Sequence, residues 1–199
     1  MNFLDGIFSF HIALYNAQQN SEAIIRLKAP RHEQEPVLFF YAKIIAFIHS
    51  YHEKLQFQSN IRSSEEIVAS TPEDYSGLMP QKLFIGAPST RALKAFARQG
   101  KELGSNAMRG YCFESVQVEA ICTALKGSGS NWIEPVTFFR IDHRFLHQLS
   151  ELETGKQRWE VTIVENNHLY LSTNHRQLET DIAAIDIWAT FQHLIANKT

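Results

Sequence analysis

Apolar and polar residues alternate in the first patterned stretch of the chain. Between positions 7 and 16, every second residue is large and apolar: Phe8, Phe10, Ile12 and Leu14. A period of two is typical of a β-strand with one buried face. Residues 18–21 have the polar composition of a turn, and residues 23–27 continue as a second strand. We therefore expect an antiparallel hairpin here.

The next pattern predicts a long helix that is apolar over most of its surface. Pro36 suits the first helical position, because the N–H that proline lacks has no partner there. The pattern continues to about Glu53 and leaves a narrow polar stripe through Lys43, Ser50 and Glu53. A helix this apolar packs on more than one side. We expect it to be central to the fold.

Strand patterns and helix patterns alternate along the rest of the chain. Strands are predicted at residues 83–85, 108–113, 136–141, 159–164 and 169–172, and helices at residues 89–103, 115–125 and 142–149. The tail has apolar residues at helical spacing: Ile185, Trp188, Phe191 and Ile195. Hairpins mixed with strand–helix alternation predict an α/β (α+β) fold, in which helices flank a central mixed β-sheet.

Composition restricts the class of protein. The 199 residues suit one domain, and 44% hydrophobic residues, with 14 Phe and 3 Trp, can fill a core, which excludes a disordered chain. The balance of 19 Lys and Arg against 21 Asp and Glu excludes a strongly basic protein that binds polyanions with its whole surface. Any contact with nucleic acid must come from a local basic patch.

The cysteines and the start of the chain indicate the compartment. Cys112 and Cys122 lack C-x-x-C spacing, which argues against a disulfide framework and a thiolate metal site. The chain begins without the basic and apolar segments of a secretion signal, and no apolar run is long enough to span a bilayer. We expect a cytoplasmic protein with no membrane partner.

Five short segments carry a family resemblance. They are Arg31-His32-Glu33-Gln34-Glu35, Glu53-Lys54-Leu55-Gln56-Phe57, Ile85-Gly86-Ala87-Pro88 followed by Arg91 and Lys94, Phe138-Phe139-Arg140-Ile141-Asp142, and Leu169-Tyr170-Leu171-Ser172. In order and spacing they resemble the YaeQ family of bacterial proteins, over roughly residues 8–183. The resemblance implies one domain over residues 1–183. Residues 184–199 would then be a C-terminal extension, which we expect to be helical.

The resemblance also implies a fold similar to that of the PD-(D/E)XK nucleases, although the family has no settled biochemical function. In that fold, acidic groups on a mixed sheet hold a divalent cation that polarises phosphate and activates water. Family members typically carry an Asp, then a Glu four positions on, before a Gly-x-Pro turn. When Gly86-Ala87-Pro88 is aligned with that turn, Pro80 and Phe84 take these positions. Neither side chain can bind a cation.

The sequence therefore predicts a degraded nuclease site and no cofactor. Nowhere in the chain is an Asp or Glu followed two residues later by Lys, as the generic motif requires. This loss favours a protein that is not an enzyme. Mg²⁺ enters only under an alternative, in which the metal ligands have moved to residues such as Glu35, Glu73 or Asp74.

Glu35 is the one acid that the family pattern retains, and it has two interpretations. It is either a surviving metal ligand or phosphate-site residue, or a carboxylate that the helix dipole stabilises by roughly 0.3–1 kcal/mol. We favour the second, because the expected partners at Pro80 and Phe84 are lost. Arg31 and His32 precede Glu35 and are candidates for contact with an anion, or else ordinary surface side chains.

A second candidate is a basic helix face. Its residues are spaced three, four and three apart: Arg91, Lys94, Arg98 and Lys101. This spacing sets them on one face, opposite the apolar residues Leu93, Phe96 and Leu103. Such a face can follow a phosphate backbone through salt-sensitive contacts. The alternative is a solvated helix face that binds nothing.

Histidine pairs give a weaker signal for a metal site. His143 and His147 lie four apart, and His49 and His52 lie three apart, on predicted helices. No Glu follows His143, so the H-E-x-x-H motif of zinc proteases is absent, and spacing gives no third ligand. We favour surface histidines and predict no metal site.

Three functions stay open. We favour a non-catalytic member of a nuclease-like fold that binds a nucleic acid or a protein partner. The second is a divalent-metal nuclease or phosphodiesterase with displaced ligands. The third is a protein-interaction or regulatory protein without nucleic acid. Fold alone does not choose between them, because unrelated functions share folds.

Overall fold

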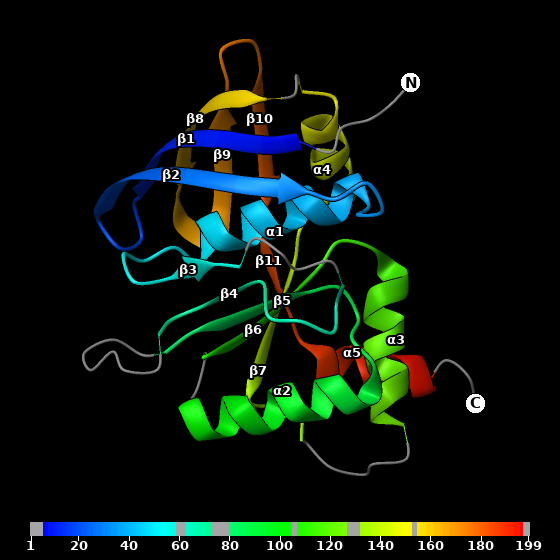
Figure 1. Cartoon of the computed structure of the whole chain (residues 1–199). Helices are drawn as coiled ribbons and strands as arrows, with labels where there is room; N and C mark the ends of the chain where they lie inside the picture. The colour runs from blue at the N-terminus through cyan, green and yellow to red at the C-terminus, as the bar shows by residue number, and fades with distance from the viewer. Residues whose placement is uncertain are drawn as a thin grey trace. The chain divides into compact units, whose positions relative to one another are not determined.

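The chain forms two structural units, each made of two separate segments of the sequence. The structure, a computed structural model, describes residues 6–58, 63–72, 80–104, 107–126, 132–152 and 155–196. The first unit comprises Met1–Ser50 and Ile141–Ala183, and the second comprises Tyr51–Arg140 and Ala184–Thr199. Figure 1 shows the strands and helices of each unit. The boundaries of a domain over residues 1–183 and an extension over residues 184–199 stay a prediction.

The first unit is built on a five-stranded mixed sheet. Its order is β10–β9–β8–β1–β2, with β1 at Gly6–Asn16, β2 at Ser21–Arg31, β8 at Lys156–Ile163, β9 at His168–Ser172 and β10 at Gln177–Asp181. β1 pairs with β2 in antiparallel direction, which confirms the predicted hairpin, and with β8 in parallel direction. The sequence did not predict β10, because Leu178 is its only large apolar residue.

Helix α1 (Val37–His49) supplies much of the core of the first unit. Every residue from Phe39 to His49 is buried, so the helix does pack on more than one side. The ring of Phe40 lies 4.8 Å from that of Phe8 on β1, centroid to centroid. The helix ends at His49, short of the predicted Glu53, because Ser50 caps it and the chain then turns.

Helix α4 (His143–Ser150) begins at the predicted cap. The Oδ1 atom of Asp142 accepts hydrogen bonds from the backbone N–H groups of Arg144 and Phe145, at 2.7 and 3.0 Å. A side-chain acceptor at this position stabilises a helix start by about 1 kcal/mol. The helix then buries Leu146 and Leu149 in the first unit.

The second unit holds a six-stranded mixed sheet of order β11–β7–β6–β5–β4–β3. The strands are β3 at Gln56–Phe57, β4 at Ala69–Ser70, β5 at Lys82–Ile85, β6 at Met108–Cys112, β7 at Val136–Arg140 and β11 at Ala183–Ile185. The three predicted strands β5, β6 and β7 pair in parallel. The two-residue strands β3 and β4 were missed, because no period of two can be recognised over two residues.

Three helices pack around one apolar cluster in the second unit. They are α2 (Thr90–Leu103), α3 (Ser115–Leu125) and α5 (Ile187–Ala196). Ser89 caps α2 as predicted, since its Oγ accepts a hydrogen bond from the N–H of Ala92 at 3.3 Å. Ile187 and Phe191 of α5 belong to the same buried cluster as Phe84 and Phe138. Helix α5 is therefore part of this core.

The predicted α/β class with mixed strands and flanking helices is confirmed. One difference is that the strands form two sheets instead of one central sheet. The N-terminal hairpin pairs with β8, more than a hundred residues away, and this long-range pairing leaves no local pattern in the sequence. Within the described ranges, no helix has both the length and the apolar character needed to cross a membrane.

Candidate functional site

Strand β5, where the family pattern places an acid of a nuclease site, contributes Phe84 to an aromatic core instead. Phe84 of β5 has no exposed surface. Its ring centroid lies 4.9 Å from that of Phe96 on α2 and 5.9 Å from that of Phe138 on β7. A Cβ added to Gly110 would lie 2.5 Å from Cζ of Phe84. The three rings therefore fill the space over Gly110, which glycine leaves open.

This arrangement does not fit a divalent cation. Mg²⁺ requires oxygen ligands, and neither the ring of Phe84 nor the side chain of Pro80 supplies one. Among the residues that the structure describes, no group of three His, Cys, Asp or Glu is placed to hold a metal ion. Glu73 and Asp74, the alternative ligands, lie outside the described residues. No catalytic step through a metal follows from this strand.

Glu35 lies at the junction between β2 and α1, and its carboxylate is buried. Its Oε1 atom is 2.6 Å from Nζ of Lys43, and neither side chain has exposed surface. The contact is an ion pair of favourable distance without good hydrogen-bond alignment. Lys43, expected on a polar stripe of the helix, thus faces the interior. The helix dipole alone does not describe this carboxylate, because its main partner is a buried ammonium group.

Arg31 and His32 lie at the same junction. Nη2 of Arg31 donates a hydrogen bond to the backbone oxygen of Glu35 at 3.0 Å, and the N–H of Glu35 donates to the backbone oxygen of His32 at 3.0 Å. Both side chains are half-buried. The structure therefore brings three of the predicted residues together in one turn. These two hydrogen bonds hold the chain as it passes from β2 into α1.

The sequence did not indicate Lys43 as a partner of Glu35. The two residues are eight positions apart, and Lys43 is the only charged residue within α1. A lone Lys in an otherwise apolar helix is the signal that points to an internal partner, because lysine is almost never fully buried unless it is paired. The rings of Phe39 and Phe40 also lie near its Nζ, at 5.8 and 5.7 Å from the centroids.

The basic face of α2 forms as the spacing predicts. Its four cations are exposed: Arg91, Lys94, Arg98 and Lys101. The opposite side of the helix buries Leu93, Phe96, Ala97 and Gly100. Ten residues separate the first cation from the last, which corresponds to about 15 Å along the helix axis. This set of four side chains is called the α2 basic face.

Few protein groups compete for these cations. Among the described residues, the side chains of Arg91, Arg98 and Lys101 form no hydrogen bond or ion pair. Nζ of Lys94 lies 5.7 Å from the ring centroid of Trp132, within the range of a cation–π contact. Trp132 is half-buried and was not predicted as part of the face. The α2 basic face therefore combines an aromatic ring with cations that no acid in the described part of the chain neutralises.

The N-terminal end of α2 already holds an anion from the protein. The carboxylate of Glu65 accepts hydrogen bonds from the N–H of Ser89 at 2.5 Å and from its Oγ at 2.7 Å. A carboxylate in this place is stabilised by the helix dipole. An external phosphate would have to approach the side of α2 rather than its end.

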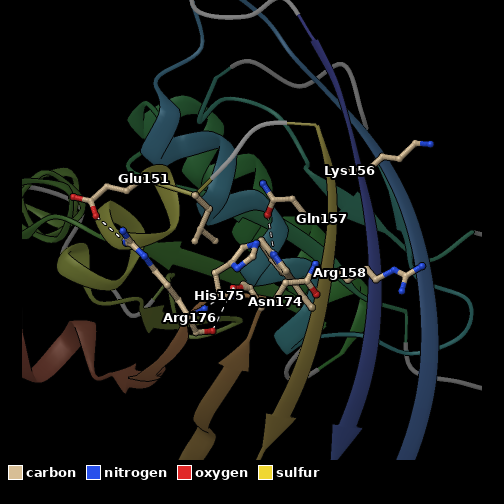
Figure 2. A pocket seen from close by; sticks show the side chains of 10 residues that line it. Glu151, Lys156, Gln157, Arg158, Asn174, His175 and Arg176 are labelled. Atoms are coloured by element: carbon tan, nitrogen blue, oxygen red, sulfur yellow. Dashed lines mark hydrogen bonds and ion pairs between the residues drawn. The ribbon is translucent and has the colours of Figure 1, made fainter.

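The first unit contains a pocket of about 340 Å³ that matches none of the predicted residues. It is lined by Glu151, Leu152, Lys156, Gln157, Arg158, Trp159, Thr173, Asn174, His175 and Arg176. Figure 2 shows Glu151 joined to Arg176, with Lys156 and Arg158 directed away from the other labelled side chains. Arg176 Nη1 is 3.0 Å from Glu151 Oε2, and Trp159 Nε1 donates to Gln157 at 2.8 Å. Several of the polar groups of the pocket are thus already paired with one another.

Burial weakens the two cysteines as nucleophiles and His52 as a base. It raises the pKa of the Cys112 thiol to about 12. Burial also raises the pKa of Cys122, with Glu119 adding to the effect. Burial lowers the pKa of His52, and the charge of Arg109 acts in the same direction. Nε2 of His52 lies 3.2 Å from Oγ1 of the buried Thr71.

Comparison with known proteins gives one family. The family model described as YaeQ protein matches residues 1–182. The crystal structure of YaeQ protein from Pseudomonas syringae is 15% identical, with a TM-score of 0.69, over 91% of this chain and 96% of that one. The crystal structure of YaeQ protein from Xanthomonas axonopodis pv. citri is 12% identical, with a TM-score of 0.70, over 91% of this chain and 98% of that one. No curated protein matches the chain. The match over almost the whole chain shows that this protein belongs to the YaeQ family.

Proposed function

We propose that this YaeQ-family protein binds nucleic acid through the α2 basic face and does not cleave it. The observation that carries the proposal is the exposure of four cations along one side of α2: Arg91, Lys94, Arg98 and Lys101. No described acidic group neutralises Arg91, Arg98 or Lys101. The net charge of the whole protein is −2, so this local face is where a polyanion would be attracted.

The geometry of the face suits a phosphate backbone better than a single anion. Successive cations rise about 4.5 to 6 Å along the helix axis, so they present a line of charge and not a cradle. Contacts of this kind release counterions and carry little sequence information. Trp132, beside Lys94, adds a ring on which an unpaired base can stack. We therefore expect binding that is salt-sensitive and tolerant of sequence.

The absence of cleavage is supported by the aromatic core at β5. The pattern of the YaeQ family, aligned on Gly86-Ala87-Pro88, puts Pro80 and Phe84 where the acids are expected, and Phe84 is fully buried between Phe96 and Phe138. The retained acid, Glu35, is engaged with Lys43 in the core of the first unit. Both observations count against the alternative of a metal-dependent phosphodiesterase with Glu35 as a ligand.

The test is a combined binding and cleavage assay on labelled single- and double-stranded DNA and RNA, in EDTA, Mg²⁺ and Mn²⁺. We expect binding in EDTA without products in any metal. The variant Lys94→Glu/Arg98→Glu should weaken binding by at least about tenfold, because it reverses two contacts in the middle of the line.

The matched control is Lys126→Glu/Arg144→Glu, which changes the net charge equally at two exposed positions off the α2 basic face. Equal loss of affinity in both variants would mean that only net charge matters, and the face would have no role. Products that require metal would overturn the non-catalytic part of the proposal. Absence of binding to all four nucleic acids would leave the third hypothesis, a protein partner, in its place.

A further inference from the structure

The outer face of the first-unit sheet carries its charges in two separate halves. The strand register sets Lys28, Ser9 and Lys156 in one row across β2, β1 and β8. The next row along the strands holds Arg26, His11 and Arg158. The four Lys and Arg side chains of these rows are exposed. They form the basic half of the face.

The other end of the same face is acidic. Its carboxylates are also exposed: Glu22, Glu160, Glu179 and Asp181. Glu22 pairs with Tyr15 on β1, and Glu179 pairs with Tyr170 on β9, so these residues lie in a further row, parallel to the two rows described above. Glu160 lies beside Ala13, one row from Arg158. The four carboxylates form the acidic half, and two of them, Glu179 and Asp181, already lie 3.7 and 2.6 Å from ring nitrogens of His168 on the same face.

Exposed apolar side chains gather on this face as well. Ile7 is 67% exposed, Ile24 62%, Tyr170 46% and Tyr15 40%. Among the described residues, only one other large apolar side chain, that of Val116 on α3, is exposed to this degree. Ile24, Tyr15 and Tyr170 lie in two neighbouring rows at the acidic end, whereas Ile7 lies at the other end of β1. An exposed apolar group rimmed by charges marks an interaction surface. The face is therefore built for a partner that is both apolar and charged.

We propose that the partner is a second copy of this chain, packed face to face with its strands antiparallel to those of the first. A two-fold axis in the plane of the interface and perpendicular to the strands reverses the strand direction. It sets each strand over the same strand of the other copy, so the cations of β2 and β8 meet the carboxylates of Glu22 and Glu160 on those strands. Arg158 then approaches Glu160 of the other copy, and Lys28 approaches Glu22.

The balance of charge favours this partner over a polyanion. A nucleic acid that contacted the basic half would meet repulsion from Glu22 and Glu160 on the same face, within two rows of Arg26 and Arg158. It would also leave Ile24 and Tyr170 exposed. A second copy sets Arg158 and Lys28 against carboxylates and covers Ile24 and Tyr15 at the same time.

The size of the overlap suits a weak dimer. The two-fold sets β1, β2 and β8 over their counterparts, and three strands at about 4.8 Å spacing, over about 27 Å of strand length, give roughly 400 Å² on each copy. Two copies would bury about 800 Å², which is below the range for stable specific protein–protein interfaces and indicates a transient one. The proposal goes beyond the binding of nucleic acid, because it uses other residues in the other unit and does not depend on the α2 basic face.

The test uses two charge variants of the full chain. The acidic variant is Arg26→Glu/Arg158→Glu, and the basic variant is Glu22→Lys/Glu160→Lys. Each variant alone sets like charges against each other across the interface, whereas a mixture of the two restores opposite charges between residue 158 of one copy and residue 160 of the other. All four positions are exposed, so folding should be unchanged, which circular dichroism and thermal melting check.

Sedimentation velocity should show a dimer fraction of the wild-type protein that grows as the concentration is raised to about 100 μM, since an interface of this size gives weak association. Each variant alone should dissociate at least about tenfold more readily, and the equimolar mixture should regain a dimer that contains one copy of each. Ile24→Thr/Tyr15→Thr, which keeps all charges, should also weaken the dimer.

Three results would overturn the proposal. The first is a wild-type protein that stays monomeric over the whole concentration range. The second is a dimer that neither charge variant affects, which would place the contact elsewhere, such as the free edge of β2. The third is a mixture that does not regain the dimer. If the protein is monomeric and the acidic variant loses nucleic-acid binding, the basic half is instead a binding site for a polyanion.

Discussion

The ammonium group of Lys43 lies 2.6 Å from the carboxylate of Glu35, and both side chains are fully buried. Removal of either partner leaves the other charge in the core without its main counterion. Such a loss costs about 3–5 kcal/mol, whereas replacing both partners with apolar residues of similar volume is often neutral. We expect Glu35→Gln and Lys43→Met each to lower the free energy of unfolding by this amount.

The double variant Glu35→Leu/Lys43→Met should recover most of the stability that the single variants lose. Urea unfolding, followed by circular dichroism, measures all three. The exposed pair of Arg176 and Glu151 is the matched control, because pairs near the surface contribute only about 0–1 kcal/mol. If Glu35→Gln were as stable as the wild type, Glu35 would not depend on Lys43, and a role in binding or catalysis would gain weight.

Gly110 is required by the ring of Phe84. A Cβ at residue 110 would come within 2.5 Å of Phe84 and within 2.9 Å of Phe138. Overpacking of a filled core costs about 1–3 kcal/mol, and we expect Gly110→Ala to destabilise the protein by this amount in thermal melting. Gly6→Ala is the control, because a Cβ there meets nothing within 4 Å. The double variant Gly110→Ala/Phe84→Leu should be more stable than Gly110→Ala alone, because the smaller side chain removes the clash with the new Cβ. A double variant that is no more stable would show that the clash is relieved elsewhere in the core.

The strands and helices with local patterns were predictable, and the pairings between distant segments were not. The alternation from Phe8 to Leu14 predicts β1, and the cap at Ser89 predicts α2, because both signals lie within a few residues. β10 has no such signal and is held by its register with β9. The division into two sheets depends on the pairing of β1 with β8, which only the folded chain reveals.

The same reason explains what could be predicted of the candidate site. The α2 basic face lies on one helix, so its spacing alone was enough. The basic half of the first-unit sheet joins Arg26 to Arg158 through His11, and these residues are neighbours only because three strands align. The ion pair of Glu35 with Lys43 was missed because burial, and not spacing, makes the two residues partners.

Cys112 should be unreactive in the folded protein. Burial raises the pKa of its thiol from the ordinary value of 9.0 to about 12, so almost no thiolate is present at pH 8 to attack an alkylating reagent. We expect iodoacetamide to label Cys112 only after urea unfolding, as read by mass spectrometry of the digested protein. Rapid labelling of the native protein at pH 8 would contradict the burial of this thiol.

The raised pKa of Cys112 also has a consequence for stability. Between about pH 9 and pH 12 the unfolded thiol loses its proton while the folded thiol keeps it, so the contribution of this group to stability is present below pH 9 and falls as the pH rises through this window. Cys112→Ala should remove this part of the alkaline loss, although it also removes buried volume. The comparison of unfolding free energies at pH 7 and pH 10 separates the two effects, since the loss of volume is the same at both.

Salt dependence measures how many cations of the α2 basic face contact phosphates. For each phosphate contact, the slope of log K against log salt changes by about 0.7 to 0.9, for single- and double-stranded nucleic acid respectively. Substitution of one contacting cation by Ala should therefore reduce the slope by about one and weaken binding to all sequences alike. We expect this for Arg91→Ala, Lys94→Ala, Arg98→Ala and Lys101→Ala, with Lys126→Ala as the control.

Lys94→Ala should lose more affinity for single strands than the others do, because Lys94 also lies beside the ring of Trp132. If none of the four substitutions changes the slope, the phosphates are bound elsewhere on the protein.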